Sequence, residues 1–283
     1  MHIANVTQFR FQPVVQTYSW KDSILYALGL GYGSDPLSPS ELAFAYEENL
    51  KAVPSFCVVL AHPGFWAKRP EFEIDWVRLL HGEQSFEMHR PLPASGSVRG
   101  EYAIEAIDDK GPEKGAVLYQ VKRLYDTASD ELIATVRSVV FLRGDGGCGS
   151  IGTAPPAPLP ERAPDGTIEI ATLPQQALIY RLNGDFNPIH ADPEPARQAG
   201  FERPILHGLC TMGIATRALL QVFSPDRPER LKSMFVRFSK PVFPGETIVT
   251  EYFGGAGSEF QFRCRVKERD VIVLDRGRAT FVD

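Results

Sequence analysis

The sequence predicts an α+β fold made of two related halves, each with antiparallel strands packed around a helix. Three observations lead to this prediction: an internal repeat, a strand-rich end in each half, and one long apolar helix in the second half. The chain has 283 residues, which is enough for one large domain or two small ones. Parallel βαβ units are not indicated, because the strands follow one another without helices between them.

The internal repeat relates residues 89–98 to residues 239–248. Both segments read as a basic residue, a proline, an aliphatic residue, a short loop with glycine and then a β-former. Between them, residues 144–164 contain Gly or Pro at 10 of 21 positions, a composition that suits a linker better than a helix or central strand. We therefore expect a first half over 1–145, a linker over 146–165 and a second half over 166–283, although chance similarity of two strand-rich regions is the alternative.

Each half ends in a run of segments rich in Val, Ile, Leu and Tyr, broken by short polar or glycine-containing turns. In the last run, apolar and polar residues alternate over positions 260–266, as in a strand with one buried face. The predicted strands are Val98–Ile107, Gly115–Tyr125, Glu131–Leu142, Thr247–Phe253, Glu259–Lys267 and Val271–Val282.

Three helices are predicted in the second half, before its strands. Asp and Pro open one of them as N-cap and first helical residue, and Gly200 stops it. Another is apolar on all sides and contains small residues, so we expect it to be surrounded by protein. The predicted helices are Gln175–Leu182, Asp192–Ala199 and Leu206–Val222.

Composition excludes several classes of protein. Net charge is −5, and the 30 Lys and Arg are scattered, which argues against a nucleic-acid partner. No apolar run approaches the length of a membrane span. The four cysteines lack the spacing of a disulfide framework or a zinc site, and we expect reduced thiols. With no secretory pattern at the start and no SKL-type ending, the expected compartment is the cytoplasm.

The segment richest in side chains capable of acid–base chemistry is the loop that carries Asp185, Asn187 and His190. Pro188 disfavours helix in this loop and stiffens it, so the three polar side chains can converge on one point. A carboxylate, an amide and an imidazole around one water suit general acid–base catalysis. The alternative is that Asp185 and Asn187 only cap a turn and that His190 fills a gap.

Gly208 is expected in the first turn of the long buried helix. Backbone N–H groups are free there and the helix dipole is positive, so this amide can stabilise a carbonyl oxygen that gains negative charge. The missing Cβ would let a ligand approach closely. Tight packing between helix and sheet is the alternative reason for glycine.

These segments resemble a known family, the type 2 enoyl-CoA hydratases of the MaoC-like group. Its pattern is an aromatic residue, a spacer, a small residue and then Gly-Asp-x-Asn-Pro-aliphatic-His; Asn183 departs from it at the small residue. Further segments are similar to the long members, such as the hydratase 2 domain of peroxisomal multifunctional enzymes type 2. The matching stretches are Leu80–Gln84, Asp108–Gly111, Tyr180–His190 with Ala196, Pro204–Leu209 and Phe238–Val242.

The resemblance implies a double hotdog fold and reversible syn hydration of trans-2-enoyl-CoA to (3R)-3-hydroxyacyl-CoA. It implies no metal or redox cofactor, an acyl-CoA substrate and a homodimer. Asp185 and His190 would be catalytic, Asn187 would help to hold the water, and the Gly208 amide would bind the thioester oxygen. The residues that would contact the CoA portion or the acyl chain are His81, Gly82, Lys110, Phe186, Pro188, Ile189 and Phe238.

Two other functions remain open at this point: a thioesterase of the same fold, and a non-catalytic acyl-CoA-binding module. The first half lacks an Asp-x-Asn-Pro-x-His loop and should be catalytically silent. The place of its central helix is Pro54–Gly64, where Pro63 and Gly64 allow barely two helical turns. Such a short helix should leave apolar space inside the sheet for an acyl tail.

Overall fold

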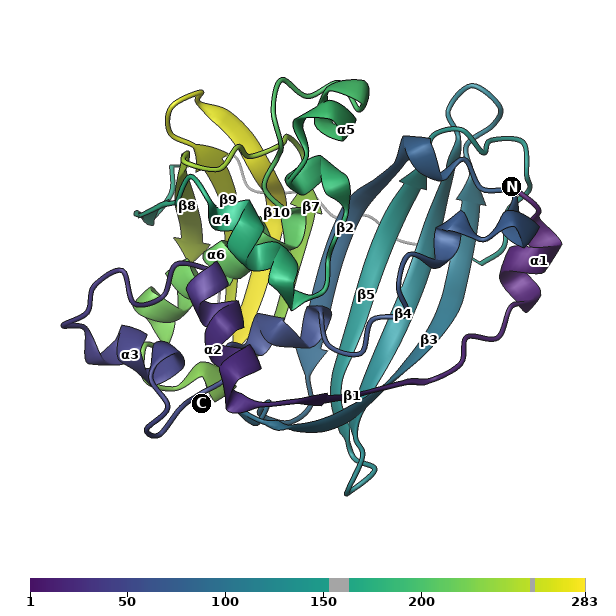
Figure 1. Cartoon of the computed structure of the whole chain (residues 1–283). Coiled ribbons are helices and arrows are strands. Elements are labelled where there is room, and N and C mark those ends of the chain that lie inside the picture. The colour runs from purple at the N-terminus through teal and green to yellow at the C-terminus, as the bar shows by residue number, and fades with distance from the viewer. Residues whose placement is uncertain (153–162, 255–257, 283) are drawn as a thin grey trace.

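The computed structural model describes residues 1–152, 163–254 and 258–282, whose ten strands form one antiparallel sheet. The strand order is β1-β3-β4-β5-β2-β7-β10-β9-β8-β6. Helices lie on one side of this curved sheet (Figure 1). The strands are β1 Val14–Tyr18, β2 Leu79–Met88, β3 Gly96–Asp109, β4 Ala116–Asp126, β5 Leu132–Leu142, β6 Gly166–Ala171, β7 Leu231–Phe238, β8 Thr247–Gly254, β9 Glu259–Val266 and β10 Val271–Phe281.

The sheet consists of two groups of five strands with the same connectivity. The first group runs β1-β3-β4-β5-β2 and the second runs β6-β8-β9-β10-β7, so each strand has a counterpart five strands later. The groups join where β2 pairs with β7, with Phe86 opposite Met234. Pro91 and Pro241 of the sequence repeat each follow one of these joining strands. This order agrees with the duplication that the sequence suggested.

All six predicted strands are present, with ends shifted by a few residues. Sequence analysis left β1, β2, β6 and β7 without an assignment. In β2 the alternation of inward- and outward-facing residues is interrupted at Gly82, which forms a bulge between His81 and Glu83 in the pairing with β5. A Cβ at Gly82 would lie 2.4 Å from the Phe141 ring, so this bulge accepts no larger residue without movement.

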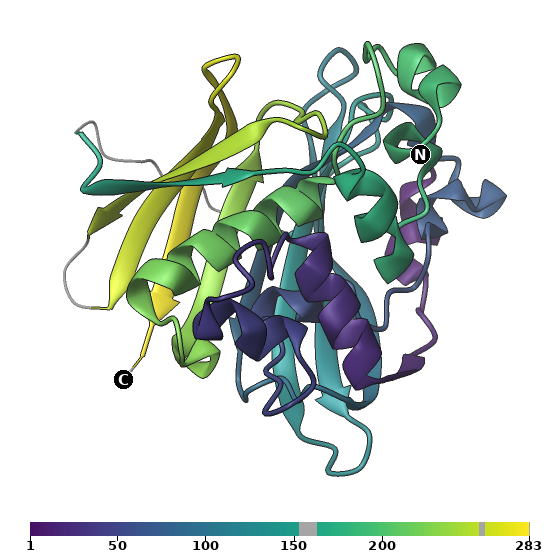
Figure 2. The ribbon, with the colours of Figure 1, turned by 60° about the vertical axis from the view of Figure 1, so that its left-hand side comes forward.

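The long helix α6 begins at Gly208, two residues later than predicted, and all its residues from Cys210 to Leu220 are buried. Figure 2 shows it along the inner face of the second strand group, with α2 and α3 beside it. In α5 the predicted cap is confirmed, since Asp192 accepts a hydrogen bond from the Glu194 amide. The α-helices are α1 Ile3–Gln8, α2 Trp20–Gly29, α3 Pro39–Ala45, α4 Gln176–Tyr180, α5 Pro193–Gln198 and α6 Gly208–Phe223. The 3-10 helices are η1 Pro54–Val58, η2 Trp66–Lys68, η3 Pro70–Phe72, η4 Trp76–Arg78, η5 Arg181–Asn183, η6 Pro188–His190 and η7 Pro228–Arg230.

The central helix of the first half is even shorter than predicted, because η1 ends at Val58. Lys122 on β4 explains this end. Its buried ammonium donates to the carbonyl oxygens of Cys57, Val58 and Leu60, at 2.8, 3.1 and 2.6 Å, and so replaces the amides of a further helical turn. Burial lowers the pKa of Lys122 to about 8.

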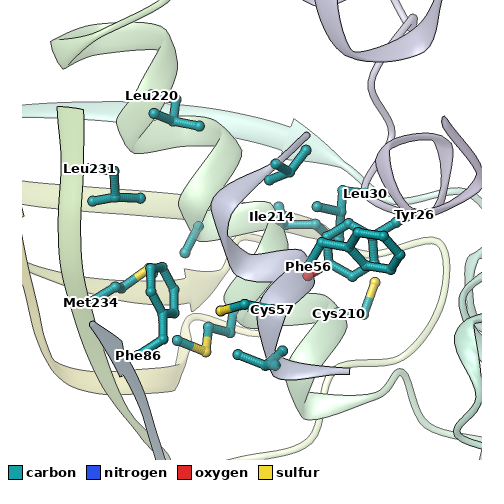
Figure 3. Packing of buried hydrophobic residues seen from close by; sticks show 14 of the residues in the cluster. Tyr26, Leu30, Phe56, Cys57, Phe86, Cys210, Ile214, Leu220, Leu231 and Met234 are labelled. Carbon is teal, nitrogen blue, oxygen red and sulfur yellow. The ribbon is translucent and has the colours of Figure 1, made fainter. Parts of the chain in front are cut away.

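The main core lies where the helices of both halves meet the joining strands. Tyr26 of α2, Phe56 of η1 and Ile214 of α6 pack together there, with Phe86 and Met234 below them (Figure 3). All four cysteines are free, as expected. Ten residues of the predicted linker, 153–162, lie outside the described residues. In the described chain, no helix is long and apolar enough to cross a membrane.

Candidate active site

The loop after α4 and η5 is shaped by short-range hydrogen bonds. Gly184 has φ +111°, a conformation that favours glycine, and it turns the chain out of η5. Asp185 Oδ1 then accepts a hydrogen bond from the Asn187 amide at 3.2 Å. Asn187 Oδ1 caps η6 by accepting from the Ile189 amide at 3.3 Å. The two side chains therefore shape the turn, as in the alternative interpretation, and present the Asp185 carboxylate beside η6.

His190 ends η6 and is only 7% exposed. Its Nδ1 lies 2.8 Å from the carbonyl oxygen of Ile205. A carbonyl oxygen can only accept, so Nδ1 carries the proton, and Nε2 of the neutral ring keeps a lone pair. Burial lowers the pKa of His190, while the negative charge of Asp185 opposes that shift. His190 is thus a neutral ring whose Nε2 can accept a proton.

The structure adds His207, which sequence analysis did not assign. Its ring stacks on His190 with centroids 3.7 Å apart and planes at 26°. Its Nε2 lies 3.1 Å from the backbone oxygen of Asp185. The sequence feature that could have identified His207 is its position, because it directly precedes Gly208 in the segment already selected as functional.

Asp185, His190 and His207 each offer a ligand atom, and these atoms lie within 4.8 Å of one another. A metal ion normally lies close to the plane of each imidazole ring that binds it, at about 2.0–2.1 Å. Two nearly parallel rings stacked at 3.7 Å share no such point. This trio therefore does not fit a metal ion without a rotation of one ring.

Gly208 is the first residue of α6, and its amide N–H donates no hydrogen bond to another of the described residues. The predicted contact residue Phe238 lies against it: a Cβ at position 208 would be 3.0 Å from the Phe238 ring. The same ring meets His81 edge-on, with centroids 4.8 Å apart. Phe238 thus connects the start of α6 to β2 of the first half.

Two histidines of the first half lie near the loop. His81 is on the inner face of β2, and His62 follows η1. Burial lowers the pKa of both, to about 4 for His62, and Asp185 is close enough for its charge to oppose each shift. His62 is nevertheless exposed to solvent at part of its surface. Sequence analysis did not find His62, since no motif surrounds it.

The other predicted contact residues lie at the surface. Phe186 is 59% exposed, and the guanidinium of Arg181 lies 5.2 Å from its ring centre. Pro188 is exposed and Ile189 is half-buried. Lys110 lies in the turn after β3, where it pairs with Asp108. Its contacts are all local, so the structure does not bring it to the Asp185–His190 loop.

Family models match both halves of the chain. A MaoC-like domain matches residues 156–273, and the N-terminal domain of MFE-2 hydratase 2 matches residues 16–144. Enoyl-CoA hydratase 2 from Arabidopsis thaliana is 39% identical over 91% of this chain and 88% of its own length. The chain belongs to the MaoC-like enoyl-CoA hydratase 2 family. The family resemblance of the sequence is therefore confirmed.

Other members support the same assignment. 3-Hydroxyacyl-thioester dehydratase Y from Mycobacterium tuberculosis is 38% identical over 96% of this chain and 95% of its own length. A MaoC-like dehydratase structure from Phytophthora capsici is 36% identical, with a TM-score of 0.87 over 100% of this chain and 99% of its own. The structure of an M. tuberculosis protein described as having a double hotdog fold is 16% identical in sequence. It matches with a TM-score of 0.61 over 96% of each chain. The double hotdog fold is thus confirmed.

Proposed function

We propose that this member of the hydratase 2 family catalyses reversible syn addition of water to trans-2-enoyl-CoA, with (3R)-3-hydroxyacyl-CoA as product. One observation carries the proposal: the carboxylate of Asp185 and a ring nitrogen of His190 lie within 4.8 Å of each other, next to the start of α6. Two proton carriers at one point suit a reaction that takes a proton from water and returns one to carbon.

In the proposed reaction the oxygen of water bonds to C3, and the C2=C3 electron pair moves toward the thioester carbonyl. The Gly208 amide stabilises the oxygen that gains negative charge there. The proton taken from water is then returned to C2, so one water is added in all. Asp185 and His190 share the two proton transfers, and Asn187 helps to hold the water. The reaction uses no metal or redox cofactor.

We further propose that His81, Gly82, Phe238 and the exposed Phe186–Ile189 edge of the loop contact the substrate. Lys110 would serve the CoA phosphates from the rim of the first half. The enzyme would act as a cytoplasmic homodimer. Light scattering during gel filtration tests the dimer through a mass twice that of the chain, and imaging of a tagged copy tests the location.

A hydration assay across enoyl-CoA chain lengths tests the reaction. We expect loss of the conjugated enoyl absorbance and a product of (3R) configuration by chiral chromatography. Release of free thiol from saturated acyl-CoA would instead identify a thioesterase. Binding of acyl-CoA with neither reaction would identify a non-catalytic module.

A further inference from the structure

His207 occupies a central place that the proposed reaction does not yet use. It is 1% exposed and stands at the N-cap of α6, directly before Gly208. Its ring stacks on that of His190, and the Tyr180 ring lies with its centroid 5.1 Å away and its plane at 51° to that of His207. Its Nε2 is 3.1 Å from the Asp185 carbonyl oxygen. One side chain therefore contacts both segments that carry the proton-transfer groups.

We propose that His207 is a positioning residue: it holds the backbone of Asp185 through Nε2–H and supports the ring of His190 by stacking. A carbonyl oxygen accepts only, so Nε2 of His207 must carry the proton. The contact is made to the backbone of Asp185, which leaves its carboxylate available. His190 is fixed in a similar way by Ile205, and together these contacts set the separation of the two proton carriers.

His207 can fill this place only as a neutral ring. Its Nδ1 is buried and has no partner among the described residues, so a second proton there would have no acceptor. Burial, together with the neighbouring His190 and Arg181, lowers the pKa of His207 to about 4, while the charge and the backbone oxygen of Asp185 oppose this shift. Tyr180 is the other titratable group packed on the ring. When His190 takes up a proton in turnover, the stacked partner stays uncharged.

The inference rests on the proposed hydration, so its tests include one that needs no reaction. Nitrogen-15 NMR of the wild-type protein labelled at histidine reports the tautomer directly. We expect the Nε2–H form of His207, unprotonated down to pH 5. The Nδ1–H tautomer would overturn the proposal whatever the enzyme catalyses. Absence of hydration by the wild type would instead refute only the proposed function.

Three variants separate the two contacts. H207Q keeps a donor near the Nε2 position, H207F keeps a ring, and H207A removes both. We expect H207A to lose about 10²-fold in kcat with little change in KM, because a small misplacement of catalytic groups has effects of this size. H207Q should recover most of the loss. H207F should shift the acid limb of the pH profile of kcat, since Asp185 is no longer held beside His190.

Binding of a saturated acyl-CoA and the circular dichroism spectrum serve as controls for folding. Wild-type kcat in H207A would overturn the positioning role. An H207Q variant that binds acyl-CoA but is as slow as H207A would overturn the role of the Nε2 donor. If H207A fails to fold, H207Q and H207F still decide between these outcomes.

Discussion

At the scale of single residues, the site depends on which atom of each imidazole carries the proton. Backbone carbonyls decide this for both rings, Ile205 for His190 and Asp185 for His207. The result is one neutral ring with a free Nε2 lone pair and a second neutral ring behind it. Hydrogen bonds to the main chain thus prepare the side chains for acid–base work.

Substitution of either proton carrier should abolish most of the activity. Asp185→Asn or His190→Ala should each lower kcat at least ~10²-fold, the usual contribution of a positioned acid or base. Folding should survive, because Pro188 and the turn hydrogen bonds of Asn187 shape the loop. Steady-state hydration kinetics and thermal unfolding provide the measurements. A variant with near-wild-type kcat would remove that residue from the mechanism.

Stability should fall in mild acid because of the buried histidines. An unfolded histidine titrates near pH 6.5, whereas burial lowers the pKa of folded His207 to about 4. Between these values the unfolded chain binds a proton that the folded chain does not, so unfolding becomes easier as pH falls through this window. Urea unfolding should show a loss on the order of 2 kcal/mol from pH 7 to pH 5.

His207→Gln is the matched variant for this effect. It should weaken the dependence of stability on pH. Equal free energies of unfolding at pH 7 and pH 5 in the wild type would contradict the argument.

At the scale of elements, α6 connects the site to both halves. Its first residue packs against Phe238 at the end of β7, and Arg217 in its middle reaches the first half. Arg217 donates to the backbone oxygen of Leu30 and to the Ser34 hydroxyl, and it pairs with Glu41 of α3. The helix is therefore held by packing at one end and by a buried ion pair farther along.

Gly208→Ala should separate the two explanations for glycine at the start of α6. The methyl group would meet the Phe238 ring and also obstruct a thioester oxygen that approaches the amide. If obstruction dominates, the double variant Gly208→Ala/Phe238→Ala should stay at least ~10-fold below Phe238→Ala alone in kcat. Recovery of kcat in the double variant would show that only the displaced ring mattered.

Removal of one partner from the buried pair should destabilise the fold strongly. The side chains of Arg217 and Glu41 are 4% and 6% exposed. Arg217→Met leaves the carboxylate buried without its cation, and we expect a loss of about 3–5 kcal/mol in the free energy of unfolding. The exposed pair of Arg197 and Glu194 is the control, where Arg197→Ala should cost no more than ~1 kcal/mol. Equal losses in urea unfolding would contradict this account.

At the scale of the whole molecule, the two halves differ in their central helix, because the sheet of the first half packs against only a short one. Three residues on the inner side of β3, β4 and β5 are half-buried rather than buried: Ile104, Gln120 and Ser138. Contrary to the expected apolar space, two of them are polar. Gln120 donates to Ser138 and accepts from the Trp66 indole, so this polar pair is largely satisfied within the protein.

An acyl tail that packs against the inner side of this sheet should make longer substrates better ones. Each buried methylene can add up to ~0.8 kcal/mol, so kcat/KM should rise over the first several carbons beyond C4. Kinetics with enoyl-CoAs from C4 to C10 provide the measurement. Ser138→Phe should remove the gain for C10 and spare crotonyl-CoA, while Ser138→Ala should keep both. A steady fall in wild-type kcat/KM from C4 to C10 would refute the idea.

The sequence by itself determined the elements that depend on neighbouring residues. The loop from Gly184 to His190, the Asp192 cap and the apolar helix α6 follow from backbone preferences and spacing within a few positions. The family pattern lies in these same short segments. It therefore predicted the fold class, whereas the repeat of residues 89–98 at 239–248 predicted the two strand groups of the same connectivity.

Only the tertiary structure decided which distant groups meet. His207 stacks on His190 from 17 positions away, and Lys122 ends η1 from 64 positions beyond Val58. The pair of Arg217 and Glu41 is 176 positions apart in the chain. Such contacts depend on how the sheet closes around the helices, and no local preference of the chain specifies their partners.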